Sequence, residues 1–175
     1  MIAQQDSAAF ESPRVGDTVV YAAHGIGQVV ALAQQQVGGT ERDCIVVDLA
    51  TGLRVTLSLE EAGERLRAVA DENEIEDVRR TLNAESSVVD KQWKTRVTES
   101  KAKLASGRPT ELAELVRDGS RFEQMRGSQL PHGERRLYLQ ARELLVREIS
   151  AARGLEQDEA ETWIEAQISS SEGED

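Results

Sequence analysis

Cysteine, histidine and aromatic residues are scarce in this chain of 175 residues, which has one cysteine, two histidines and an aromatic fraction of 3%. The single cysteine, Cys44, excludes an intramolecular disulfide and fits a reducing, intracellular compartment. His24 and His132 each lie beside a glycine, and neither has a cysteine or a second histidine at metal-ligand spacing. The sequence therefore argues against a disulfide-stabilised fold and against the common metal sites.

Long apolar runs and familiar catalytic motifs are also missing. No stretch is long enough to span a bilayer, and residues 1–6 have neither the basic start nor the apolar core of a signal peptide. The chain has no nucleophile elbow and no His-Glu-x-x-His sequence. The glycines of residues 24–27 predict a tight bend, because neither a helix nor a Lys-Ser/Thr pair follows them. We expect a soluble cytoplasmic binding protein, not an enzyme, with no cofactor and no metal.

Charge is distributed unevenly along the chain, whose net charge is −11. Residues 1–90 hold 7 Lys/Arg and 16 Asp/Glu (net −9), residues 91–153 hold 14 and 8 (net +6), and residues 154–175 hold none and 8 (net −8). Such asymmetry indicates different partners for different segments, with nucleic acid suited to the basic one. An ordinary solvent-exposed helical surface can carry a similar positive charge. Charge alone therefore favours such a surface over a nucleic-acid-binding site.

A short, β-like period extends from Arg14 to Val69, with glycines at turn or bulge positions between the apolar runs. The expected strands are residues 18–21, 26–33, 43–49 and 53–59. Four or five short strands with tight connections predict a small, curled antiparallel barrel.

Beyond residue 70 the apolar residues recur at helical spacing. Ser87–Asp90 has the form of a capping box, which predicts a helix that runs to Ser106 and stops at Gly107. Further helices are expected after Pro109, Pro131 and Gly154. The second half is therefore predicted to be a compact all-helical bundle, which makes the whole fold α+β.

Trp93 lies among lysines and arginines at the start of the basic helix. A large aromatic ring flanked by cations can insert between bases while the cations bind phosphates. One helical stripe contains Val89, Trp93, Val97 and Leu104, so burial of Trp93 in the core is an equally credible interpretation. Its position in the first two helical turns favours a ring that projects past the packed face. Trp163, among glutamates, is expected to pack against the bundle.

The chain resembles the CarD/CdnL family of bacterial transcription regulators over most of residues 14–153. Val15–Gly27 resembles the opening signature of the family, and Gly38-Gly39 falls at its hairpin turn. The resemblance in the helical half is carried by Leu104–Gly107, Leu115–Asp118, Gly133–Leu137, Ala141-Arg142 and Leu145-Val146. Their common order and spacing make the resemblance specific.

This resemblance implies a Tudor-like domain that docks on the β subunit of bacterial RNA polymerase, and a helical domain that contacts promoter DNA at the upstream edge of the transcription bubble. Family members have a tryptophan at the position of Trp93, which wedges into the minor groove and stabilises the open complex. Together with the basic helix, this predicts a largely sequence-independent DNA-binding set: Trp93, Lys91, Lys94, Arg96, Lys101 and Lys103. At the position of Thr56, some family members have an arginine that contacts polymerase. Arg54 can make this contact instead if its side chain lies on the same face of the strand as that of Thr56.

The expected organisation has five segments: a flexible N-terminus (1–13), a Tudor-like RNA polymerase-interacting domain (14–70), a linker or connecting helix (71–86), a helical DNA-binding domain (87–168) and an acidic disordered tail (169–175). A monomer is expected, with a domain-swapped dimer as the alternative.

Three departures from the family pattern leave other functions open. Ala22 replaces a common proline, Ser58–Ala62 replaces a proline-containing segment, and Val97 replaces a basic or aromatic residue. The alternatives are a polymerase-docking adaptor without productive DNA contact and a chaperone-like adaptor that binds a peptide of another protein.

Overall fold

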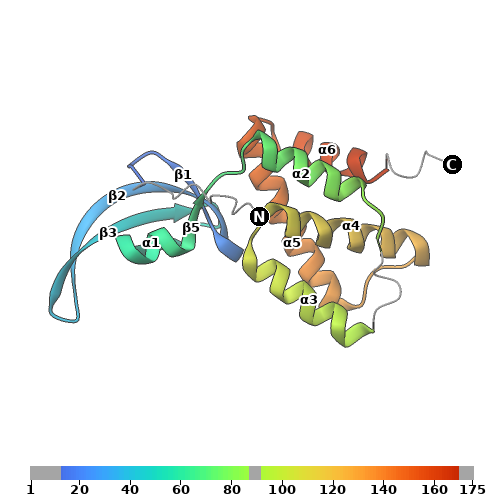
Figure 1. Cartoon of the computed structure of the whole chain (residues 1–175), viewed down its shortest axis with the longest axis horizontal. Coiled ribbons are helices and arrows are strands. Elements are labelled where there is room, and N and C mark those ends of the chain that lie inside the picture. The colour runs from blue at the N-terminus through green and yellow to red at the C-terminus, as the bar shows by residue number, and fades with distance from the viewer. Residues whose placement is uncertain (1–12, 87–91, 170–175) are drawn as a thin grey trace, which may run out of the picture. The chain divides into compact units, whose positions relative to one another are not determined.

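The computed structural model describes residues 13–86 and 92–169 (Figure 1). The chain divides into two compact units, Met1–Val69 and Ala70–Asp175, which we call the sheet unit and the helical unit. An antiparallel sheet followed by helices confirms the expected α+β class. Within the described ranges, no helix is both long enough and apolar enough to cross a membrane.

The sheet unit contains five strands in the order β4-β3-β2-β1-β5, and every neighbouring pair is antiparallel. The elements are β1 (Thr18–Tyr21), the 3-10 helix η1 (Ala22–His24), β2 (Gly25–Val37), β3 (Thr40–Leu49), β4 (Arg54–Ser58), α1 (Leu59–Arg65) and β5 (Leu66–Ala68). All four expected strands are present. Closure into a barrel would require β4 to pair with β5, but these strands form the two edges of the described sheet. The sheet is therefore open, and the expected small antiparallel barrel is not confirmed.

Alternating apolar residues give the sheet unit its own core, in which Val19, Val29, Ile45 and Val47 are almost completely buried. Gly27 fits this core because a Cβ atom there would lie 2.7 Å from Cγ1 of Val47. The close approach of β2 to β3 explains this glycine without a phosphate loop.

The helical unit contains α2 (Glu72–Asn83), α3 (Trp93–Ser106), α4 (Pro109–Arg126), α5 (His132–Arg153) and α6 (Gln157–Ser169). The backbone of α3 ends at Gly107, which has a left-handed φ of 63° and confirms the predicted stop. The expected start of this helix and its capping box, residues 87–90, lie outside the described residues. Leu112, Leu145 and Ile149 are among the fully buried side chains that join the helices.

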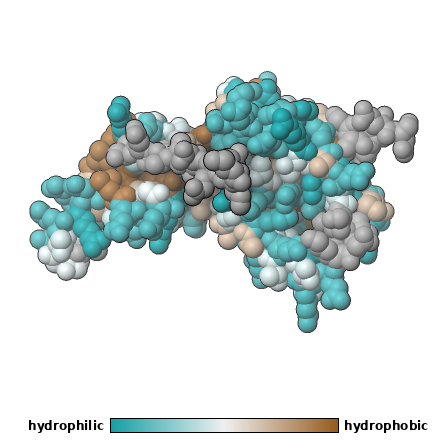
Figure 2. Space-filling view, viewed as in Figure 1, coloured by the Kyte–Doolittle hydropathy of each residue, from teal (hydrophilic) through white to brown (hydrophobic). Residues whose placement is uncertain are grey.

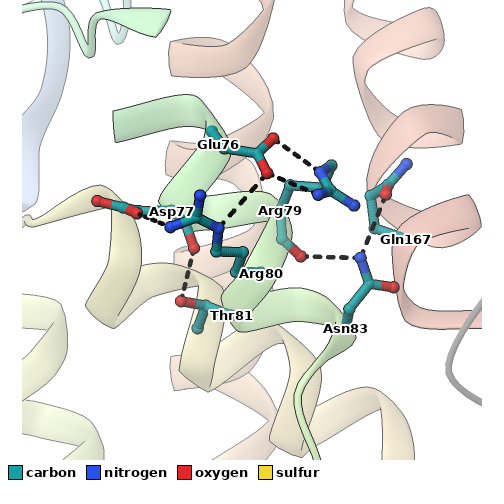
Figure 3. Close-up of polar contacts among 7 residues, drawn as sticks. All are labelled: Glu76, Asp77, Arg79, Arg80, Thr81, Asn83 and Gln167. Atoms are coloured by element: carbon teal, nitrogen blue, oxygen red, sulfur yellow. Dashed lines mark hydrogen bonds and ion pairs between the residues drawn. The ribbon is translucent and has the colours of Figure 1, made fainter. Parts of the chain in front are cut away.

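Helix α2 belongs to the helical unit, whereas the sequence suggested a linker or connecting helix over residues 71–86. Ile75, Val78 and Leu82 are buried in the same core as α4 and α5. The opposite side of α2 carries exposed ion pairs, in which Glu76 binds the guanidinium groups of Arg79 and Arg80 (Figure 3). An amphipathic helix of this kind is stabilised by packing against a partner face.

The acidic helix α6 is also packed, since Ala160, Ile164 and Ile168 are buried. Arg142 of α5 binds the carboxylates of both Glu161 and Glu165 of α6. Trp163 is partly buried against the core, which confirms the prediction for this residue, and the Arg153 guanidinium carbon lies 5.3 Å from its ring centroid. Residues 170–175 of the expected tail lie outside the described residues.

Candidate functional site

Trp93 is the first residue of α3 and is 53% exposed. Leu104, which shares its helical stripe, is buried in the core, and Val97 of the same stripe is partly buried against it. The stripe is thus buried from the second turn onward, and Trp93 lies beyond the end of the packed face. An exposed indole at this position contradicts the alternative of a core tryptophan and leaves a large apolar surface available for contact.

Lys94 and Lys101 lie on one flank of the Trp93 stripe, because successive residues of a helix turn by about 100°. Both residues are exposed, and neither forms an ion pair with another described residue. Lys91, the other lysine expected close to Trp93, falls outside the described residues. Helix α3 therefore places one aromatic ring and two accessible ammonium groups on neighbouring faces.

Arg96 and Lys103 lie on the other flank of α3 and are engaged within the protein. Arg96 donates two hydrogen bonds to the carboxylate of Glu134 in α5, at 2.9 and 3.1 Å, and these bonds raise the pKa of the guanidinium. The Lys103 ammonium lies 2.6 Å from a carboxylate oxygen of Glu114 in α4. The Arg96 side chain is only 14% exposed, so it is less accessible to a nucleic acid than the exposed side chains of Lys94 and Lys101.

Arg126 is a candidate that the sequence analysis missed. This exposed residue ends α4, and its guanidinium carbon lies 4.9 Å from the Phe122 ring centroid. The guanidinium carbon of Arg96 lies 5.2 Å from the centroid of the same ring. The guanidinium groups of Arg126 and Arg96 thus both lie over the Phe122 ring. The position of Arg126 in the sequence does not indicate a binding site, because cations are common in the last turn of helices, where they interact favourably with the helix dipole.

In the sheet unit, β4 carries the two expected polymerase contacts, Arg54 and Thr56. Both residues are exposed, and their spacing of two places the side chains on one face of the strand. The Leu49 N–H donates a hydrogen bond to the Leu53 carbonyl across β3 and β4. Because hydrogen-bonded pairs alternate along an antiparallel ladder, the backbone groups of Arg54 and Thr56 point away from β3.

The Arg54 side chain forms a bidentate contact with Asp48, at 2.5 and 2.7 Å. The hydrogen bonds from this guanidinium lower the pKa of the Asp48 carboxyl, and the same bonds raise the pKa of Arg54. Both side chains are exposed, so the pair is weak enough to exchange for another partner.

Apolar side chains are also accessible on the sheet unit. Val15, Leu32 and Leu53 are each more than half exposed. Figure 2 shows apolar residues gathered over one part of the visible face of this unit, beside hydrophilic residues, whereas the visible face of the helical unit is mainly hydrophilic. A surface of this composition suits a protein partner.

Two family models match the chain. Residues 14–70 match the CarD-like/TRCF RID domain, and residues 77–165, which make up just over half of the chain, match the CarD C-terminal domain. The matches follow the resemblance found in the sequence and correspond to the sheet unit and the helical unit in turn. A CarD-like/TRCF RID domain indicates a transcription factor that interacts with RNA polymerase. The chain belongs to the CarD family of transcription factors.

Proposed function

We propose that this protein docks on the β subunit of bacterial RNA polymerase and stabilises the promoter open complex by inserting Trp93 into the minor groove at the upstream edge of the bubble. The observation that carries this proposal is the exposed indole at the first residue of the basic helix α3. Removing the exposed apolar surface of this ring from water is favourable, so the ring is suited to contact with a partner.

The docking step is assigned to the Tudor-like sheet unit. Its residues 1–69 hold 5 Lys/Arg and 9 Asp/Glu, a net charge of −4, so it is less acidic than the −9 of residues 1–90 suggests. The acidic balance still disfavours DNA, and the edge of β4 offers backbone donors and acceptors to an added strand. Arg54 and Thr56 lie on this edge and supply side-chain contacts to polymerase.

The DNA step is assigned to the helical unit. Lys94 and Lys101 bind phosphates beside the fork, which makes the interaction tolerant of sequence and sensitive to salt. Arg126, whose guanidinium lies over the same Phe122 ring as that of Arg96, adds a third cation. Stacking of a base on an aromatic ring contributes about 1–3 kcal/mol, which shifts an open/closed equilibrium about five- to hundredfold. Docking keeps the helical unit at high local concentration, so weak DNA affinity is sufficient.

A polymerase-docking adaptor without productive DNA contact is the second candidate. It is favoured by the internal pairing of Arg96 and Lys103, which removes two cations from the accessible surface. Fluorescence titration with a forked promoter fragment separates the two functions, because the adaptor would leave the fragment unbound.

The wedge is tested by Trp93→Ala, with Leu139→Ala as the matched control at another exposed apolar residue of the helical unit. We expect Trp93→Ala to shorten the lifetime of the open complex about five- to hundredfold without weakening polymerase binding. Leu139→Ala should leave both properties unchanged. An unaltered lifetime in Trp93→Ala would remove the wedge from the mechanism.

A further inference from the structure

The first turn of α3 begins without the usual side-chain cap. Gln92 occupies the N-cap position, and its side chain forms no capping hydrogen bond to the described residues. The first bond of the helical ladder is donated by the Arg96 N–H to the Gln92 carbonyl, at 3.1 Å. An uncapped helix end leaves backbone N–H groups unsatisfied and frays readily. Trp93 lies in this turn, so its orientation depends on whatever else holds the turn in place.

The Arg96 side chain ties this turn to two other helices. Its Nε and Nη2 groups donate to the two carboxylate oxygens of Glu134 in the first turn of α5, at 3.1 and 2.9 Å. Its guanidinium carbon also lies 5.2 Å from the centroid of the Phe122 ring in α4. A planar guanidinium bound through two parallel hydrogen bonds has a fixed orientation as well as a fixed position. Glu134 also suits the positive end of the α5 dipole.

We infer that Arg96 and Glu134 form a clamp that fixes the first turn of α3 and thereby sets the orientation of the Trp93 indole. The inference rests on the proposed function, and it makes Arg96 a positioning residue instead of a phosphate contact. A ring that is already held in its inserting orientation loses less conformational freedom when it enters the DNA.

Burial and charge argue against a direct role of Arg96 on DNA. The side chains of Arg96 and Glu134 are 14% and 9% exposed, so the charges face each other in a largely desolvated site. A phosphate that approached Arg96 would also meet the Glu134 carboxylate. Opening such a pair leaves a buried charge without its partner, which is strongly unfavourable.

The chain offers a matched control in the Lys103–Glu114 pair, which links α3 to α4 more than two turns from Trp93. Glu134→Gln and Glu114→Gln each remove one carboxylate that faces a cation of α3. If only electrostatics mattered, both substitutions would strengthen DNA binding, because each removes negative charge near phosphate. The clamp predicts a different result for Glu134→Gln alone.

The first measurement needs no DNA. The chain has two tryptophans, so Trp163→Phe makes Trp93 the only indole while retaining an aromatic ring beside Arg153. In this full-length background, time-resolved fluorescence anisotropy reports motion of the Trp93 ring. We expect Glu134→Gln to increase the amplitude of the fast decay at least twofold, and Glu114→Gln to leave it unchanged. An unchanged decay in Glu134→Gln would overturn the clamp, whatever Trp93 does on DNA.

The second measurement is the open-complex lifetime in the presence of polymerase. We expect Glu134→Gln to shorten it severalfold and Glu114→Gln to leave it unchanged or lengthen it. On the Trp93→Ala background, Glu134→Gln should have no further effect. A larger fast anisotropy decay of the Trp93 indole with an unaltered open-complex lifetime would overturn the link between the clamp and the wedge. If Trp93→Ala itself has no effect, the proposed function fails, and this result is separate from the anisotropy readout.

Arg96→Lys provides a milder variant should Glu134→Gln fold poorly, as circular dichroism would reveal. Lysine keeps the positive charge but cannot form the bidentate contact. A phosphate contact tolerates this change, since a point charge serves it well, whereas a clamp does not. We expect a faster indole decay and a shortened lifetime in Arg96→Lys. A lifetime equal to that of the parent protein, with an unchanged decay, would overturn the positioning role.

Discussion

Gly119 lies in the middle of α4, where the Tyr138 ring of α5 packs directly on the helix. A Cβ atom at this position would overlap Cδ2 of Tyr138 and lie 2.8 Å from its Cγ. We therefore expect Gly119→Ala to reduce the free energy of unfolding by about 1–3 kcal/mol through overpacking. Chemical denaturation with a folded-state probe for the helical unit measures this change.

The matched control for this prediction is Gly133→Ala in the first turn of α5. A Cβ atom at Gly133 meets no atom within 4 Å. This substitution should be neutral or stabilising by up to about 1 kcal/mol, because alanine restricts the unfolded chain. Equal stabilities of the Gly119 and Gly133 variants would show that Tyr138 moves aside without cost.

Lys94 and Lys101 are the two exposed lysines of α3, and the proposed function assigns phosphate contacts to them. In the double variant Lys94→Gln/Lys101→Gln, binding of the protein to a forked promoter fragment should weaken. The slope of log K against log[salt] should fall by about 0.7–0.9 for each lost phosphate contact. Fluorescence anisotropy titrations at several salt concentrations give this slope. Lys103→Gln should change it less, because Glu114 already binds Lys103; the same slope in both variants would contradict the assignment.

The environment of a single side chain can be predicted from the sequence when neighbouring residues in the chain determine it. The position of Trp93 at the helix start led to the correct expectation that its ring projects from the packed face. The environment of Arg96 was not predictable, since its partner Glu134 is 38 residues away and belongs to another helix.

Ala22 has a φ of +32°, a value that proline does not adopt. The departure from the family pattern at Ala22 thus accompanies a local backbone that excludes proline.

At the scale of elements, the spacing of apolar residues predicted the strands, and the turn residues predicted the ends of the helices. Gly107 and Gly154 each end a helix with a left-handed φ, which matches their use as stop signals. Sheet closure was not predictable, because it depends on whether β4 and β5 pair with each other, and local sequence carries no such information. The packing of α2 depends on similar long-range contacts, since its buried face meets helices distant in sequence.

The open edge of β4 leads to a prediction at Thr56. Its N–H points away from β3, so Thr56→Pro removes a donor from the edge while the ladder with β3 remains. We expect polymerase affinity to fall about five- to hundredfold, which corresponds to about 1–3 kcal/mol for an unsatisfied buried acceptor on the partner. Biolayer interferometry with immobilised polymerase measures this loss.

Thr56→Ala is the control for this edge, since it removes the side chain and keeps the N–H group. If an added strand makes the contact, Thr56→Ala retains most of the affinity. Equal losses in the two variants would assign the contact to the threonine side chain instead of the backbone. Thermal unfolding of both variants should confirm that the sheet unit remains folded.

At the scale of the whole molecule, each unit has its own buried core and its own charge pattern. The apolar core of the sheet unit contains residues between 19 and 66, and that of the helical unit contains residues between 70 and 168. The change of hydrophobic period near residue 70 predicted this division, because a sheet and a helix bundle require different spacings of apolar residues. Separate cores allow the proposed docking step and the proposed DNA step to be altered independently by mutation.

This independence predicts two different dose–response curves for open-complex lifetime against protein concentration. Thr56→Pro should raise the half-maximal concentration about five- to hundredfold and leave the plateau unchanged, because docking determines how much polymerase is occupied. Trp93→Ala should keep the half-maximal concentration and lower the plateau, since the wedge determines the effect of each bound molecule. High concentration therefore rescues the first variant but not the second. If Trp93→Ala instead shifts the midpoint and keeps the plateau, the indole contributes to recruitment and does not hold the melted strands apart.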